Sequence, residues 1–205
     1  MGGTTAKACV AVGGEPLISH SFECARVSRF KRGSGLPILI PSIDLIEIGA
    51  GGGSIAHVND LGLLNVGPES SGADPGPACY AQGGADATVT DADLALGYLN
   101  ADNFLGGEMK LDVKAAEKAL LENIGKPLGV DAVHAADGIL RIATTAMSYA
   151  VKGVTTERGL DAGDFAMVAY GGAGPLHAVA VAREIGIRNV IIPYAPGVFS
   201  AFGML

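Results

Sequence analysis

Two glycine-rich bends at opposite ends of the chain have residue types suited to holding a ligand. In the segment VAYGGAGPLHAVAVAREIG (168–186), an apolar run is followed by glycines, a proline and a histidine, and then by a helical pattern. Backbone N–H groups in the first turn of a helix have no partner within the helix, and glycine lets a ligand approach closely. The bend Gly2-Gly3-Thr4-Thr5 adds two hydroxyl groups, which suit phosphate oxygens. The glycine backbone of 171–174 suits packing against a ring or a sugar. Together the two bends could hold a nucleotide by its two ends.

Two familiar phosphate motifs are excluded. The segment IGAGGGS (48–54) follows a predicted strand but reads G-x-G-x-x-S, and the residues after it do not sustain a helix and a second strand ending in an acid. A Rossmann dinucleotide site needs all of these. The only Gly-Lys pair is followed by Pro127 instead of Ser or Thr, so it is no Walker A loop.

Composition excludes other classes of protein. With 205 residues, 49% hydrophobic and 17% charged, the chain can bury a large core. A net charge of -7, without a basic run, argues against a nucleic-acid partner. No apolar run approaches the ~20 residues of a membrane helix, and no signal peptide is evident. The three cysteines are widely spaced and suit reduced thiols. We therefore expect a cytoplasmic protein, and the apolar ends predict a piece of a longer one.

The first half of the chain predicts strands followed by loops. Strands on either side of Gly13-Gly14 predict a hairpin, and DLIEIG (44–49) predicts a strand. Residues 59–112 are rich in Gly, Pro, Asp and Asn, so we expect mostly loop with one short helix at 92–98.

The second half predicts helices and then a crossover. Asp112 can cap a helix that stops at Gly125, and Asp131 can cap a longer one whose apolar residues recur at steps of three and four. A strand at 165–170, a helix at 175–186 and the strand RNVIIP follow. This order predicts a right-handed crossover in an at least partly parallel sheet.

Candidate acids and bases are few. His57 follows a glycine-rich run, and Asp74 and Asp91 lie in the loop-rich region, where substrate or metal contacts could gather. Asp beside Gly and Pro usually makes turns, and Asp91 is equally suited to capping a helix. The catalytic residues stay open, and the sequence indicates no metal-ligand cluster. Residues 155–158 are expected to close the long helix and to pair locally.

A series of segments in order resembles the hydantoinase A/5-oxoprolinase family, which includes the ATP-binding subunit of acetone carboxylase. These segments are MGGTTAKACV, IGAGGGSIA, GLLNVGPESSGADPGPACY, ATVTDADLALGYL, TTERGLD, GGAGPLHA and PGVFSAFGML. The resemblance implies an α/β fold of the ribonuclease-H-like/actin-like ATPase type, with a mixed sheet and flanking helices. Residues 1–205 would form a C-terminal-lobe portion of a larger two-domain protein, with 59–112 a loop-rich insertion and 113–153 a helical part.

The same resemblance implies the roles of the two bends. The residues matching the family's phosphate loop, on the β/γ-phosphates of ATP, are Gly2, Gly3, Thr4 and Thr5. The residues matching its adenosine loop are Gly171, Gly172 and Gly174, with His177 beside them in the first turn of the helix. The aspartate that opens the family's phosphate loop would precede Met1. Since that residue helps to place Mg²⁺, we expect this chain to be catalytically incomplete alone.

The resemblance also implies a reaction and partners. Family members use ATP to phosphorylate the oxygen of a lactam, hydantoin or small carbonyl before ring opening or carboxylation. Expected partners are the remainder of the hydantoinase A chain, a hydantoinase B-like subunit or domain, and a small cyclic amide or carbonyl substrate. Two alternatives stay open. One is a noncatalytic actin-like nucleotide-binding or assembly module, and the other is a structural domain whose glycines only serve turns.

Overall fold

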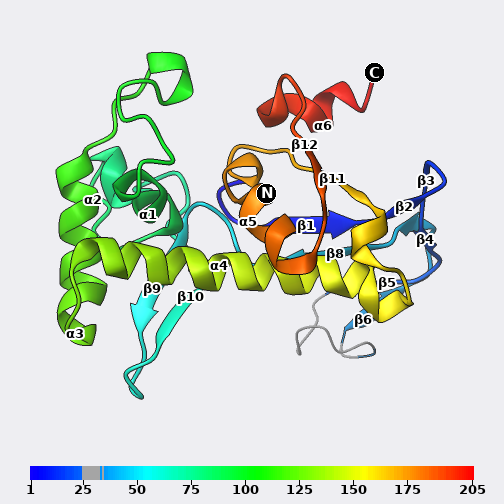
Figure 1. Ribbon diagram of the computed structural model, residues 1–205, viewed down its shortest axis with the longest axis horizontal. Helices are drawn as coiled ribbons and strands as arrows, with labels where there is room; N and C mark the ends of the chain where they lie inside the picture. The colour runs from blue at the N-terminus through cyan, green and yellow to red at the C-terminus, as the bar shows by residue number, and fades with distance from the viewer. Residues whose placement is uncertain (25–32, 34) are drawn as a thin grey trace.

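A long central helix organises the structure, which is a computed structural model describing residues 1–24, 33 and 35–205 (Figure 1). Helix α4 (Ala132–Val154) runs across the molecule and contacts helices α1 (Val89–Ala95) and α5 (Gly174–Ile185) as well as strands of the first half. Asp131 caps α4 as predicted, because its side chain accepts a hydrogen bond from the His134 N–H group. The apolar face of α4 forms much of the core.

Short antiparallel ladders make up the first half of the chain. Gly13-Gly14 turns between two of its strands, which confirms the predicted hairpin, and the strand predicted at 44–49 is present. The pairs are β1 (Ala6–Cys9) with β8 (Leu45–Ile48), β2 (Ala11–Val12) with β3 (Glu15–Pro16), β4 (Ile18–Ser19) with β7 (Ser42–Ile43), and β5 (Phe22–Cys24) with β6 (Leu36–Ile38). In the described part of the chain, each ladder contains two strands.

The predicted crossover near the C-terminus is confirmed. Strands β11 (Ala166–Val168) and β12 (Asn189–Ile191) pair in parallel, and α5 connects them. Pro175 lies in the first turn of α5, and Gly186 ends the helix in the left-handed conformation. The fold is therefore mixed α/β, with parallel and antiparallel pairing in separate ladders.

The region 59–112 contains more regular structure than the sequence predicted. Strands β9 (Ser54–Val58) and β10 (Leu64–Ser70) form an antiparallel hairpin, although Gly67-Pro68 interrupts the apolar pattern of β10. The short helix begins at Val89, three residues before the predicted start, because Thr88 and Asp91 form a capping box. The 3₁₀ turns here are η1 (Ala78–Tyr80) and η2 (Leu105–Gly107).

The helix capped by Asp112 does not stop at Gly125. Helix α2 (Val113–Leu120) continues through the π turn η3 (Leu121–Gly125) and α3 (Lys126–Leu128). The chain leaves the helix at Gly129, which has φ +69. Gly125 serves close packing instead, because a Cβ on it would lie 2.7 Å from the Val130 carbonyl oxygen.

The end of α4 is tied to the link between strands β7 and β8. Arg158, at the end of η4 (Thr156–Arg158), forms a largely buried ion pair with Asp44, 114 residues away in sequence. The prediction that residues 155–158 close the long helix and pair locally is confirmed in part, because Thr155 caps α4 and its hydroxyl donates to the Val151 carbonyl oxygen at 2.8 Å. Arg158 is the exception, since its ion pair with Asp44 forms only in the folded chain. The remaining short helices are η5 (Ala162–Asp164), η6 (Pro196–Val198) and α6 (Phe199–Phe202). Among the described residues, no helix has the length and hydropathy that a membrane span requires.

Gly125→Ala should destabilise the full-length protein. Alanine has the higher helix propensity, by about 1 kcal/mol, but its methyl group would overlap a backbone oxygen that cannot rotate away. We expect a net loss of about 1–3 kcal/mol in the free energy of unfolding, measured by chemical denaturation. Gly197→Ala is the matched control, since its Cβ would meet no atom within 4 Å. Equal stability of the two variants would contradict this account of Gly125.

Candidate functional site

The N-terminal bend packs backbone to backbone against a second glycine loop. The Gly52 N–H group donates to the Gly2 carbonyl oxygen at 3.0 Å, and Gly53 N–H donates to Gly3 at 2.7 Å. A Cβ on Gly51 would collide with the backbone of Gly3 and Thr4. The glycines that resembled a dinucleotide motif therefore form a wall behind the N-terminal bend. Sequence reasoning dismissed them as a site, and their adjacency to the bend is visible only in the fold.

The 171–174 bend contacts the other side of the same segment. The Met1 nitrogen donates to the Tyr170 carbonyl oxygen at 2.9 Å. The N–H groups of Ala173 and Gly174 donate to the Met1 carbonyl oxygen at 3.2 and 3.1 Å. Gly171 has φ +91, and a Cβ on it would collide with Met1. The two bends identified in the sequence therefore lie side by side, with Met1 between them.

The outer surface of both bends is open. Gly3, Thr4 and Gly172 are exposed, and Thr5 is half-buried where β1 begins. A Cβ built on Gly2, Gly3 or Gly172 would meet no atom within 4 Å. Contact with neighbouring atoms therefore does not require glycine at positions 2, 3 and 172. At Gly51 and Gly171 it does, because a Cβ there would collide with backbone atoms. Bare backbone open to solvent suits close approach by a phosphate or a flat ring.

Two serines that sequence reasoning missed lie beside the N-terminal bend. The Ser70 hydroxyl group donates to the Gly3 carbonyl oxygen at 3.5 Å, and the Ser71 hydroxyl donates to Gly53 at 3.3 Å. A Cβ on Gly53 would lie 2.8 Å from Ser70 Oγ. The sequence signal that could have indicated them is the pair of adjacent hydroxyl side chains in GPESSGADPGP, a segment whose composition predicts loop.

Asp91 is a capping residue in the structure. Its buried carboxylate accepts hydrogen bonds from the N–H groups of Cys79 at 2.8 Å, Ala78 at 3.3 Å and Thr88 at 3.0 Å, and from the Thr88 hydroxyl at 2.7 Å. These contacts join η1 to the start of α1. They favour the capping interpretation that the sequence left open beside a catalytic one.

His57 and Asp74 are exposed. His57 stands on β9 in register with Asn65 of β10, towards the far end of a hairpin that projects from the side of α4 opposite the N-terminus (Figure 1). A catalytic role for His57 stays a prediction.

His177 is turned into the protein instead of towards the open bends. Its side chain is 3% exposed, and its Nε2 atom lies 3.4 Å from Oδ2 of Asp93, which is 1% exposed. Direct contact between His177 and a nucleotide stays a prediction. Among the residues that the structure describes, no group of three or more His, Cys, Asp or Glu side chains could hold a metal ion.

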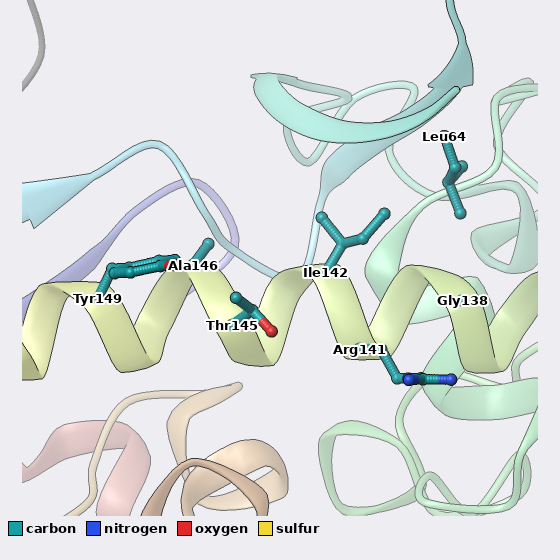
Figure 2. A pocket seen from close by; sticks show the side chains of 7 residues that line it. All are labelled: Leu64, Gly138, Arg141, Ile142, Thr145, Ala146 and Tyr149. Atoms are coloured by element: carbon teal, nitrogen blue, oxygen red, sulfur yellow. The ribbon is translucent and has the colours of Figure 1, made fainter. Parts of the chain in front are cut away.

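Two cavities lie along α4, away from the glycine bends. Figure 2 shows the first, of about 580 Å³, with Ile142, Ala146 and Tyr149 along one side of the helix and Leu64 of β10 facing it. The second, of about 280 Å³, extends from Tyr149 towards Glu157. Both linings are mainly apolar and include no residue of either predicted bend. They therefore lack the converging N–H groups that a phosphate requires.

The structure has a mixed α/β fold and a junction of open glycine bends, and comparison with known proteins assigns it to a family. A family model described as hydantoinase/oxoprolinase matches residues 1–205, so the chain belongs to this family. This confirms the resemblance seen in the sequence.

Individual relatives agree with the family. The chain is 42% identical over 205 residues to the caprolactamase α subunit of Pseudomonas jessenii, covering 100% of this chain and 28% of the relative. It is 45% identical over 165 residues to the acetophenone carboxylase γ subunit of Aromatoleum aromaticum, covering 80% and 22%. The chain therefore spans less than a third of the length of these curated relatives.

Solved structures show the same fold. A nucleotide-free structure of acetone carboxylase matches with a TM-score of 0.86 and 30% identity, over 99% of this chain and 28% of that one. The ATP-dependent caprolactamase of Pseudomonas jessenii matches with a TM-score of 0.77 and 44% identity, over 86% and 26%.

The Cys79 thiol should resist alkylation in the folded protein. Burial and the neighbouring Asp91 carboxylate raise the pKa of Cys79 far above its ordinary value. Because the thiolate is the reactive form, raising the pH from 7 to 9 should leave Cys79 unlabelled by iodoacetamide. The exposed Cys9 is the internal control, and it should be labelled under the same conditions. Peptide mapping by mass spectrometry measures both, and native labelling of Cys79 at the rate of Cys9 would refute the burial argument.

Proposed function

We propose that this chain is the nucleotide-binding portion of an ATP-dependent enzyme that phosphorylates the carbonyl oxygen of a small lactam or ketone. The contact of both bends with Met1, with open backbone on Gly3 and Gly172, carries the proposal. The relatives support it, since they include an ATP-dependent caprolactamase and subunits of ketone carboxylases.

Each bend has one task in this proposal. The N–H group of Gly3 and the hydroxyls of Thr4 and Thr5 bind the β/γ-phosphates, while the Gly2 N–H group shapes the bend by donating to the Thr5 carbonyl oxygen at 3.2 Å. The backbone of Gly171, Gly172 and Gly174 lies against adenosine. Each open glycine leaves a space that a Cβ would otherwise fill, and this space lets such a ligand approach the backbone. In this proposal the chain supplies one lobe of an actin-like ATPase, in which nucleotide lies between two lobes.

The chemistry depends on placement. ATP, when bound, supplies the phosphoryl group that turns an unreactive amide or ketone oxygen into a better leaving group. Mg²⁺ usually keeps several waters and binds through one or two carboxylates together with nucleotide phosphates. In this proposal, Mg²⁺ therefore needs one carboxylate next to the N-terminal bend in addition to the nucleotide phosphates. The bend holds the phosphates, and the Ser70 and Ser71 hydroxyls support its backbone from one side by donating to the carbonyl oxygens of Gly3 and Gly53.

The partners follow from the relatives. Caprolactamase and the carboxylases are named as subunits, and this chain covers less than a third of each. We propose that it works with the remainder of a hydantoinase A chain and with a hydantoinase B-like subunit or domain in the cytoplasm. The large hydrophobic side chains exposed on its strands and on α4, including Leu36, Ile18 and Tyr149, support contact with further protein.

Side chains added to the open glycines should block ATP without unfolding the protein. Gly3→Val and Gly172→Val fill solvent and not protein, so we expect the Kd for ATP to rise about tenfold or more with little change in the unfolding midpoint. Titration calorimetry on the full-length protein with its partner subunit measures the Kd. Ala180→Val, at an exposed position of α5 outside the bend, is the control.

Substrate dependence separates the possible functions. ATP hydrolysis by the complete complex is measured with 5-oxoproline, caprolactam, hydantoin, acetone and acetophenone. Stimulation by one of them supports the enzyme. Nucleotide binding without stimulation by any of them favours a noncatalytic actin-like assembly module. Wild-type protein that binds no adenine nucleotide would leave the glycines a purely structural role and overturn the proposal.

A further inference from the structure

A buried polar pair lies beneath the glycine bends and joins the helices that support them. Asp93 of α1 and His177 of α5 are 1% and 3% exposed, with Nε2 and Oδ2 3.4 Å apart. Neither Asp93 Oδ1 nor His177 Nε2 has a hydrogen-bond partner among the described residues. Burying a carboxylate costs free energy unless the group is fully paired. Packing alone therefore does not explain why the core contains these two side chains.

The first turn of α1 holds the phosphate side of the site. The N–H group and the hydroxyl of Thr90 donate to the Gly52 carbonyl oxygen at 2.7 and 2.8 Å. Gly52 N–H in turn donates to Gly2. A shift of α1 therefore moves the N-terminal bend through a chain of short hydrogen bonds.

The first turn of α5 holds the adenosine side. Ala173 and Gly174 donate to the Met1 carbonyl oxygen, and a Cβ on Gly52 would lie 3.7 Å from Ala173 Cβ. The starts of α1 and α5 thus meet at Gly52. Asp93 follows Thr90 by three residues and His177 follows Ala173 by four, so each lies one helical turn below this meeting point, on the same face.

We propose that Asp93 and His177 are positioning residues that fix the separation of the two nucleotide-binding bends. The inference rests on the proposed function of that site. In this proposal the side chains act through the helices and not by contact with the nucleotide. They hold α1 against α5, and through Thr90 and Ala173 they set where Gly2-Gly3 lies relative to Gly171-Gly172. This also gives the buried histidine a role that its orientation away from the open surface supports.

Variants of the pair should affect nucleotide binding more than stability. In the full-length protein, Asp93→Asn keeps the shape but removes the charge, and His177→Leu removes the polar partner. We expect each to raise the Kd for ATP about tenfold. His177→Gln keeps an N–H donor near the Nε2 position, so it should stay within about threefold of the wild type. In a double-mutant cycle, Asp93→Asn and His177→Leu together should cost little more than either alone.

A buried control separates positioning from general destabilisation. Val154→Ala, at the other end of α4 from α1, should lower the unfolding midpoint while leaving the Kd for ATP unchanged. Hydrogen exchange without ligand should quicken at 51–53 and 171–176 in Asp93→Asn and not in Val154→Ala. If the wild type binds no adenine nucleotide, the proposed function fails and this inference with it. If the wild type binds ATP and Asp93→Asn and His177→Leu bind it equally well, this inference alone is overturned.

Discussion

The backbone of Met1–Gly3 is the constraint on which the rest of the structure depends. Gly52 and Gly53 bind it on one side, and Ala173 and Gly174 bind it on the other, through main-chain hydrogen bonds of about 3 Å. Tyr170 and Met1 are joined although they are 169 positions apart in sequence. Strand β1 and helices α1 and α5 therefore meet around one extended segment, and the glycines at the contacts permit that approach.

Elements with strong local signals could be predicted from the sequence. Asp112 and Asp131 each precede an amphipathic run, and both cap helices in the structure. The crossover through α5 followed from a strand, a glycine turn, a proline and a closing glycine, all within about thirty residues. The two glycine bends were predicted from residue type for the same reason, and the structure shows them side by side at Met1, while the ligand that they bind stays a prediction.

Elements that depend on distant partners could not be predicted. The loop prediction for 59–112 was wrong at β10, because it depended on the richness of that region in Gly, Pro, Asp and Asn, whereas pairing with β9 sustains the strand. Gly125 looked like a helix stop, but its small size serves contact with Val130. Likewise, the sequence shows glycines at 51–53 without showing what they face. The buried pairing of Asp93 with His177 also depends on how α1 and α5 come together, and the sequence of neither helix indicates that arrangement.

The tight backbone contacts at Gly51 and Gly171 also bear on how such a protein can diversify. Any side chain there would displace the segment that both bends share, so the cradle itself offers little freedom for tuning. Side-chain variation that leaves this main-chain framework undisturbed has to arise at exposed neighbouring positions such as Glu69 on β10, and not at Ser70, whose hydroxyl donates to the Gly3 carbonyl oxygen. A main-chain framework with little freedom, bordered by side chains that can be replaced, suits a family whose named members include a caprolactamase and an acetophenone carboxylase.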